Sequence, residues 1–239
     1  MSRRTIAKFY RSVSVSAQDG GHAVLLDGKP LRTPGGSILI LPTEALAEAI
    51  AQEWREQGAH VDPARMPLTG LAHVAIDTIP ARRNEVADHA LGFGRSDLLC
   101  YRAEDPLELV HRQAAVWDPL LDWLREHYGI ELKTGSGLRF VNQAAEALER
   151  MAALVGTLDA FELVALDRAA GLTGSLVLAL ALLSGRLDAA AAFAAAHIDE
   201  AFQTEKWGRD AEAEARRDRM RHELAAAERF LELARISRA

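Results

Sequence analysis

Residues 37–46 read Ser37-Ile38-Leu39-Ile40-Leu41-Pro42-Thr43-Glu44-Ala45-Leu46, and the hydrophobic period changes within this stretch. Before its proline, short apolar runs bounded by turn residues are typical of β-strands. After the proline, Thr43 is a good helix N-cap, and Leu46, Ile50 and Trp54 recur at the spacing of one helical face. The stretch therefore predicts the point at which a β-rich region gives way to helices, with Gly58 as the end of the first helix.

The residues on the N-terminal side of this point, 8–41, predict a small antiparallel sheet. Val13 and Val15 alternate with serines, which is the period of two that a half-buried strand shows. Asp27-Gly28 lies between two short apolar runs, and this pair favours a two-residue hairpin because both positions need a positive φ. Pro30 follows the turn directly, so we expect its strand to lie at the edge of the sheet.

The residues on the C-terminal side predict helices almost throughout. Ser175–Ser184 is apolar almost all round, so we expect it to be the central buried helix, with Gly185 as its end. One short strand is expected near Ile130–Lys133. The expected helices are Leu68–Ile79, Arg82–Phe93, Pro106–Tyr128 with Gly129 as its stop, Asn142–Thr157 with Asn142 as its cap, Asp159–Ala170 closed by Gly171, Ser175–Ser184, an alanine-rich helix capped by Asp188, and Asp210–Ser237.

This order of elements, strands first and helices afterwards, is typical of the α+β class. We expect a small N-terminal antiparallel β domain with a trailing helix, residues 1–62, and a larger all-helical C-terminal domain, residues 63–239. Pro63 and Pro67 punctuate the stretch in which we place the boundary.

The composition describes an ordinary globular protein. The chain has 239 residues, of which 49% are hydrophobic and 26% charged, with a formal net charge of −6. An acidic total argues against a nucleic-acid partner, and a single cysteine, Cys100, excludes an intramolecular disulfide. The N-terminus lacks the apolar region of a signal peptide. The longest apolar run is Leu176–Leu183, whereas a helix that spans a membrane needs about 20 apolar residues. We therefore expect a cytoplasmic protein without membrane insertion.

Motifs for metal, nucleotide or nucleophilic chemistry are missing from the sequence. No two of the eight histidines lie four residues apart, and neither a phosphate-binding loop nor a Gly-x-Ser-x-Gly elbow occurs. We expect no cofactor and no metal. If the chain were an enzyme, a hydrolase using Glu or Asp with His197 or His222 would be the alternative.

Residues 197–217 stand out because Trp207-Gly208 interrupts two predicted helices and Asp210 can cap the second. Glu212 with Arg216 and Glu214 with Arg217 have the spacings of favourable helical ion pairs. One interpretation is a charged surface helix behind a kink, with Trp207 packed into the kink. The other is a polar recognition surface in which Trp207 inserts into a groove of a partner, because Trp is enriched at interface hot spots. Trp54, Trp117 and Trp123 have helical spacing and are expected in the core.

Six short blocks of the sequence form a characteristic series. The blocks are Leu26-Asp27-Gly28-Lys29-Pro30-Leu31-x-Thr33-Pro34, Glu53-Trp54, Met66-Pro67-Leu68-Thr69, Asp97-Leu98-Leu99-Cys100-Tyr101-Arg102, Trp117-Asp118-Pro119-Leu120-Leu121-x-Trp123, and Glu205-x-Trp207-Gly208-x-Asp210 after Asp199-Glu200. In this order they resemble the family of F-type ATP synthase assembly chaperones that bind the alpha subunit of the catalytic head. The resemblance runs from about residue 8 to residue 230.

The resemblance implies a non-enzymatic protein with a β domain and a helical domain. Such a chaperone holds the newly made alpha subunit until that subunit pairs with beta. It also implies that acidic residues near the Trp-Gly pair matter for function, and these map to Glu200, Glu205 and Asp210. Adding the neighbours in the same segment, we predict a partner-binding set of Glu200, Glu205, Trp207, Gly208, Asp210 and Glu212. Without an import sequence the chain resembles a bacterial member, and we expect a monomer.

Overall fold

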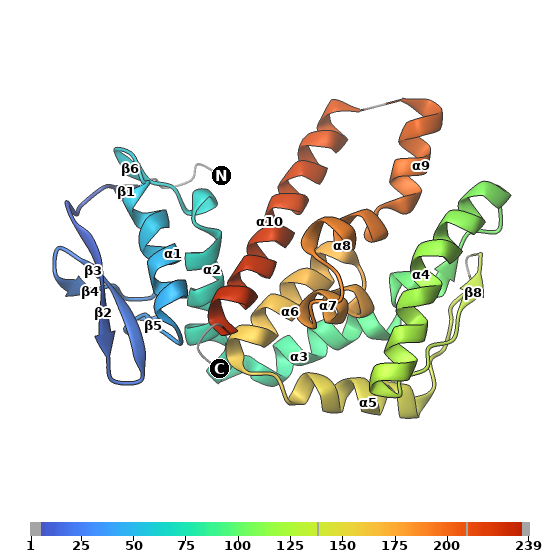
Figure 1. The fold of residues 1–239 in the computed structure, drawn as a ribbon, viewed down its shortest axis with the longest axis horizontal. Helices are drawn as coiled ribbons and strands as arrows, with labels where there is room; N and C mark the ends of the chain where they lie inside the picture. Colours follow the sequence, from blue (N-terminus) through green and yellow to red (C-terminus); the bar gives the residue numbers. More distant parts are fainter. Residues whose placement is uncertain (1–5, 138, 209, 236–239) are drawn as a thin grey trace. The chain divides into compact units, whose positions relative to one another are not determined.

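The computed structural model describes residues 6–137, 139–208 and 210–235, and Figure 1 shows its helices and strands. The chain divides into two compact units. The first comprises the described residues up to Arg83 together with those from Arg229 onward, and the second runs from Asn84 to Glu228. The strands precede most of the helices, which confirms the α+β class. The domain boundary expected after residue 62 falls inside the first unit.

The first unit contains the predicted antiparallel sheet. Its strands are β2 (Val13–Gln18), β3 (Gly21–Leu26), β4 (Lys29–Pro30) and β5 (Ile40–Leu41), and β3 pairs with each of the other three. The hairpin at Asp27-Gly28 is confirmed by φ angles of 48° and 77°. Because β4 pairs with β3 alone, the edge position predicted for Pro30 is also confirmed.

A second pair of strands in this unit, β1 (Ile6–Ala7) and β6 (His60–Val61), was not predicted. Each strand has two residues, which is too short for a hydrophobic period to appear in the sequence. The pair joins the start of the described chain to the segment that follows the first helix.

Helix α1 (Glu44–Arg55) begins where the sequence predicts. The Thr43 hydroxyl oxygen accepts a hydrogen bond from the Leu46 amide at 3.0 Å, which confirms the N-cap. Leu46, Ile50 and Trp54 are buried, as the helical spacing indicated. The helix ends with Glu56 as its C-cap, two residues before Gly58. The Thr43 hydroxyl also donates to the Leu233 carbonyl oxygen at 2.6 Å, so the end of the last helix belongs to this unit.

Glu53 of α1 fixes the start of helix α2 (Pro67–His73). Its carboxylate oxygens accept hydrogen bonds from the amides of Leu68 and Thr69, both at 2.8 Å. Burial raises the pKa of the Glu53 carboxyl. The blocks Glu53-Trp54 and Met66-Pro67-Leu68-Thr69 therefore form one structural feature, a carboxylate cap for an otherwise uncapped helix.

Helix α2 continues through a π-helical turn, Val74–Thr78, into α3 (Ile79–Arg95). The two helices expected around Pro80 are thus joined, with a kink at Arg82 where φ is −133°. In the π-helical turn, the Asp77 carboxylate accepts hydrogen bonds from the Thr33 hydroxyl at 2.6 Å and the Gly35 amide at 2.8 Å. This contact uses Thr33 of the block that begins at Leu26, together with the backbone of Gly35 just after the block.

The second unit is a helical assembly around α7 (Leu176–Leu183), in which all eight residues are buried, as predicted. The chain also contains two short 3₁₀ turns, Pro63–Arg65 in the first unit and Leu98–Cys100 in the second. The remaining helices are α4 (Leu107–Tyr128), α5 (Ala145–Gly156), α6 (Ala160–Thr173), α8 (Ala189–Ala196), α9 (Ile198–Trp207) and α10 (Ala211–Arg235).

Asp97 joins the 3₁₀ turn to the start of α7. Its carboxylate accepts hydrogen bonds from the Ser175 hydroxyl at 2.7 Å, the Val177 amide at 3.0 Å and the Leu99 amide at 3.1 Å. The side chain is fully buried, and this burial raises its pKa to about 6. The first residue of the Asp97–Arg102 block is therefore a structural cap.

Several expected boundaries in this unit are wrong. The N-cap of α5 is Ala144 and not Asn142, and α6 runs past Gly171 to end at Gly174, which has a φ of 68°. The strand expected near Ile130–Lys133 is absent from the described residues. Instead β7 (Tyr101–Arg102) pairs in parallel with β8 (Gly135–Ser136), so the C-terminal part is not entirely helical.

Two predicted helix ends are confirmed, namely Gly129 after α4 and Asp188 before α8, and Ser175, where a helix was expected to begin, is the N-cap of α7. Trp54 and Trp117 are buried, whereas Trp123 is half-buried against His127 and Tyr128. The expected end of the last helix, Ser237, lies outside the described residues. Within the described ranges, no helix has the length and apolar character that crossing a membrane requires.

Candidate partner-binding site

The segment singled out in the sequence forms a helical hairpin in the second unit, at the top of Figure 1. Helix α9 ends at Trp207, and α10 begins at Ala211. Gly208 between them has a φ of 92° and a ψ of 179°, a conformation essentially confined to glycine. The Asp210 carboxylate accepts a hydrogen bond from the Glu212 amide at 2.9 Å. The predicted interruption and the predicted cap are both confirmed.

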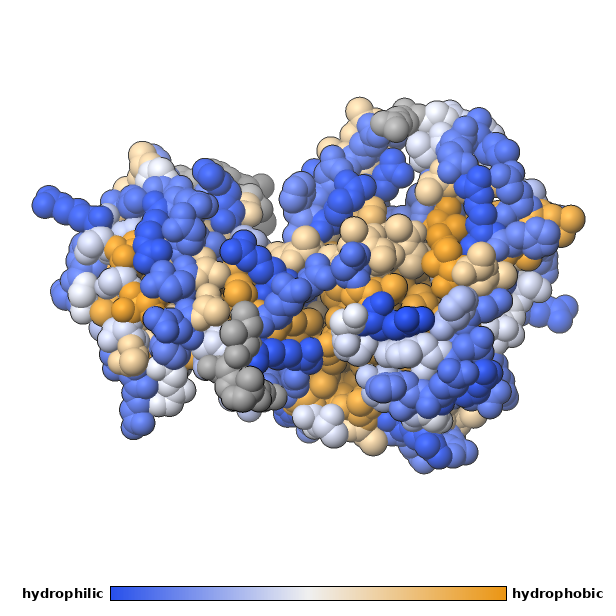
Figure 2. Space-filling view, viewed as in Figure 1, coloured by the Kyte–Doolittle hydropathy of each residue, from blue (hydrophilic) through white to orange (hydrophobic). Residues whose placement is uncertain are grey.

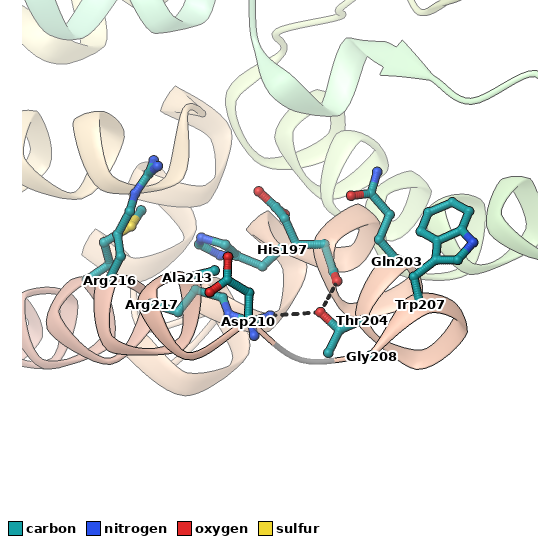
Figure 3. Close-up of a pocket in the computed structure, with 11 residues that line it drawn as sticks. His197, Gln203, Thr204, Trp207, Gly208, Asp210, Ala213, Arg216 and Arg217 are labelled. Carbon is teal, nitrogen blue, oxygen red and sulfur yellow. Dashed lines mark hydrogen bonds between the residues drawn. The ribbon is translucent and has the colours of Figure 1, made fainter.

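A groove with a volume of about 340 Å³ lies between the two helices (Figure 3). Helix α9 contributes residues at helical spacing, so a single stripe of that helix faces the groove. Near the middle, Arg217 of α10 donates a 3.4 Å hydrogen bond to the Thr204 hydroxyl of α9. The lining residues are His197, Glu200, Gln203, Thr204, Trp207, Gly208, Asp210, Ala213, Arg216, Arg217 and Met220.

Trp207 is the most exposed large hydrophobic residue in the described chain, with 79% of its surface accessible. Figure 3 shows its ring projecting from α9 beside Gln203 and away from Arg216 of α10. The interpretation in which Trp207 packs into the kink is therefore wrong. An exposed Trp at the rim of a groove has the properties of an interface anchor.

Two opposite charges line the groove without neutralising each other. Glu200 lies on α9 and Arg216 on α10, and both are exposed. In the described part of the chain neither side chain forms an ion pair, so the predicted pair between Glu212 and Arg216 is wrong. Each charge remains available to a group of opposite sign on another molecule.

The opposite stripe of α9 packs against α4. Phe202 is 4% exposed, and the guanidinium of Arg112 and the ammonium of Lys206 lie 5.3 and 5.2 Å from the centre of its ring. Both carboxylate oxygens of Glu205 accept hydrogen bonds from Arg112, at 2.9 and 2.8 Å. Helix α9 therefore has one stripe that faces the groove and another that docks on α4.

A second groove has a volume of about 550 Å³ and adjoins the first, since Thr204 and Arg217 line both. Its other lining residues are mostly charged: Ala201, Glu205, Glu214, Asp218 and Arg221. Figure 2 shows mainly hydrophilic side chains along both arms of the hairpin and a hollow between them.

The structure brings together four of the six predicted partner-binding residues, because Glu200, Trp207, Gly208 and Asp210 all line the first groove. Glu205 turns to α4 and the second groove, and Glu212 is exposed on the first turn of α10 outside both. Gln203, Thr204, Arg216 and Arg217 also line this groove but are not among the predicted binding residues. The spacing of three and four residues from Glu200 and Trp207 is a signal that identifies Gln203 and Thr204.

The histidines of the hydrolase alternative are engaged with the backbone. Nδ1 of His197 lies 2.9 Å from the Phe193 carbonyl oxygen, and Nδ1 of His222 lies 2.7 Å from the Asp218 carbonyl oxygen. Neither contact pairs a histidine with a carboxylate, which is the combination that the hydrolase alternative invokes. Among the described residues, no group of three or more His, Cys, Asp or Glu side chains has the geometry of a metal site.

A family profile and several known proteins match this chain. The sequence profile of the family described as ATP12 chaperone protein matches residues 7–125. The crystal structure of Atp12 from Paracoccus denitrificans is 45% identical, covers 96% of this chain and 99% of its own, and superposes with a TM-score of 0.91. A crystal structure from Agrobacterium tumefaciens is 40% identical over 97% of this chain and 87% of its own, also with a TM-score of 0.91.

A relative from fission yeast, the mitochondrial protein atp12, is 28% identical over 213 residues, which span 84% of this chain and 73% of that protein. The resemblance inferred from six sequence blocks is thereby confirmed, including its non-enzymatic character. The chain belongs to the ATP12 chaperone family.

Proposed function

We propose that this chain holds the unassembled alpha subunit of the F-type ATP synthase through the first groove of the α9–α10 hairpin. Family membership supports the chaperone role and the partner. The exposure of Trp207 at the rim of the groove is the observation that supports a binding role for this hairpin.

The other blocks of the resemblance support this proposal because contacts within the chain engage their acidic side chains. Asp27 accepts hydrogen bonds from the amides of Arg11 and Ser12, at 3.0 and 2.8 Å. Glu53 caps α2, and Asp97 caps α7. Nε1 of Trp117 donates to the Ala195 carbonyl oxygen at 2.8 Å. The block around Trp207 is the one that presents a large apolar side chain to solvent.

The groove has the chemistry of a temporary protein contact. An isolated alpha subunit exposes apolar surface that beta covers in the assembled head, and such surface drives aggregation. Trp207 supplies one apolar anchor, and Glu200 and Arg216 supply charges that select a complementary surface. A small exposed groove with one anchor favours binding that a larger alpha–beta interface can displace.

The central experiment is co-expression of the tagged chain with its cognate alpha subunit, followed by pull-down. We expect the wild type to retain alpha and keep it soluble, and Trp207→Ala to weaken binding about thirtyfold, the loss typical of an interface hot spot. Phe140→Ala is the matched control, because Phe140 is 71% exposed and lies outside both grooves of the hairpin. Failure of the wild type to retain alpha would contradict the proposed function.

We also propose that one monomer captures one alpha subunit in the cytoplasm of a bacterial cell. The match to two bacterial relatives over nearly the whole chain supports the bacterial setting. Light scattering of the purified complex measures the stoichiometry, and a mass equal to one chain plus one alpha subunit is the expected result.

A further inference from the structure

We infer that Glu205 supports capture of the alpha subunit as a positioning residue, by holding α9 on α4 through Arg112, and that it does not contact the client. This inference rests on the proposed function of the groove. It separates Glu205 from Glu200 and Asp210, the other two acidic residues that the family resemblance groups with it.

The carboxylate of Glu205 is already engaged within the chain. Nη1 of Arg112 donates to both of its oxygens, at 2.9 and 2.8 Å. Nη2 of Arg112 donates to Glu108 one turn earlier on α4 at 2.8 Å, and Nζ of Lys206 reaches the other Glu108 oxygen at 3.2 Å. Two acidic and two basic side chains thus alternate across the contact between α9 and α4.

The pKa shifts agree with a coupled network. The hydrogen bond to Glu205, and after it the one to Glu108, raises the pKa of Arg112. The hydrogen bonds from Lys206 and then Arg112 lower the pKa of the Glu108 carboxyl. Both pKa shifts favour the charged forms of Arg112 and Glu108, in agreement with the ion pairs that the distances show.

The contacts beside this network fix α9 along its length. The Phe202 ring is buried against α4 between Arg112 and Lys206. Closer to the start of α9, Nε2 of Gln113 donates to Asp199 at 2.7 Å. These residues, Asp199, Phe202, Glu205 and Lys206, form the stripe of α9 that docks on α4.

The groove-facing stripe of α9 takes its position from this docking. Glu200, Thr204 and Trp207 lie on it. Across the groove, Arg217 of α10 reaches Thr204 by a hydrogen bond of 3.4 Å, which is long for a strong contact. The position of Trp207 therefore depends more on the contacts with α4 than on this bond to α10.

The test is a double-mutant cycle on alpha retention with Glu205→Gln, Arg112→Gln and the two combined. An exposed ion pair contributes up to about 1 kcal/mol, which corresponds to about a fivefold change in affinity. We expect each single variant to weaken retention by up to about fivefold and the double variant to be no weaker than either one. If Glu205→Gln lowers retention equally in the wild-type and Arg112→Gln backgrounds, Glu205 touches the client and the inference is overturned.

Amide hydrogen exchange of the free protein tests the positioning without the client. Both single variants are expected to speed exchange in α9 by a similar factor, and the double variant to add nothing. Unchanged exchange in α9 would overturn the inference even if capture fell. Because this readout needs no alpha subunit, it separates failure of the inference from failure of the proposed function.

Two controls complete the design. Glu146→Gln removes a comparable exposed ion pair, with Arg150 on α5 at 2.9 Å, and is expected to leave retention unchanged. Thermal unfolding of every variant by circular dichroism is expected to match the wild type within a few degrees. A large loss of thermal stability in Glu205→Gln alone would instead assign it a general structural role and overturn the inference.

Discussion

At the scale of single residues, Asp97 is a buried carboxyl whose pKa lies above its usual range. Burial raises this pKa to about 6, so the folded protein holds the Asp97 proton more tightly than the unfolded chain does. Its contribution to stability is therefore fully present below about pH 4 and is lost as the pH rises through 6. We expect the stability of the wild type relative to Asp97→Asn, which does not titrate, to fall by about 2 kcal/mol between pH 4 and pH 7.

Urea denaturation of both proteins at the two pH values measures this difference. Using the difference cancels the titration of the other carboxyl groups. A relative stability that rises with pH would show that the hydrogen bonds from Ser175, Val177 and Leu99 outweigh burial and hold the pKa below its usual value.

Some residues of the candidate site could be predicted from the sequence, and others could not. Trp207, Gly208 and Asp210 were identifiable because an interrupted helix, a glycine and a cap leave local signals. The partner of Glu205 could not be identified from the sequence, because Arg112 is 93 residues away and no periodicity relates the two helices. The predicted pair of Glu212 with Arg216 failed because exposed helical ion pairs contribute only a few tenths of a kcal/mol and do not enforce one geometry.

At the scale of elements, the start of α2 depends on Glu53. In Glu53→Gln, the side-chain NH₂ group faces one of the two backbone amides that the carboxylate accepts from, so that amide loses its acceptor. A buried donor without an acceptor costs about 1–3 kcal/mol of stability. We expect Glu53→Gln to lower the free energy of unfolding by this amount in urea denaturation. Glu56→Gln, an exposed change at the end of the same helix, is the control and is expected to have little effect. Equal stabilities of the two variants would contradict the capping role.

The link between α9 and α10 depends on Gly208. No atom lies within 4 Å of the position that a Cβ would take there, so Gly208→Ala adds strain only through the positive φ of 92°. Such strain costs about 1–3 kcal/mol and is relieved by movement of the hairpin. We expect weaker alpha retention with little change in the melting temperature of the whole protein.

The control for this change is Gly92→Ala in α3. No atom lies within 4 Å of the position that a Cβ would take at Gly92 either, but the backbone there is helical, so the substitution adds no backbone strain. Retention by Gly208→Ala that equals retention by Gly92→Ala would show that the conformation of the link is irrelevant to capture.

Element boundaries were predictable where a side chain caps the helix. Thr43 and Asp188 accept hydrogen bonds from the amides of Leu46 and Ala191, and both helix starts were placed correctly. The helix end predicted at Gly171 was wrong, because a glycine inside a helix has the same sequence signature as a glycine that ends one, and only packing distinguishes the two. The pairs β1–β6 and β7–β8 join segments far apart in the chain and were therefore invisible to local patterns.

At the scale of the whole molecule, the first unit is not continuous in sequence. A boundary after residue 62 follows from the change of period, yet the unit extends to Arg83 and takes in the chain again from Arg229. The bond from the Thr43 hydroxyl to Leu233 spans 190 residues. The end of α10 is therefore a structural part of the N-terminal unit, which no local pattern indicates.

This discontinuity predicts the effect of a truncation after Glu228. The deletion removes Phe230 and Leu231, which are 0% and 4% exposed, together with the acceptor of the Thr43 hydroxyl. Burial of two such side chains contributes about 3–6 kcal/mol, a large share of the 5–15 kcal/mol that stabilises a typical domain. We expect hydrogen-exchange mass spectrometry to show loss of protection across residues 6–83, with α7 in the second unit still protected. If α7 loses protection to the same extent, the two units fold as one cooperative body. Full protection in both would instead mean that residues 6–83 are stable without the end of α10.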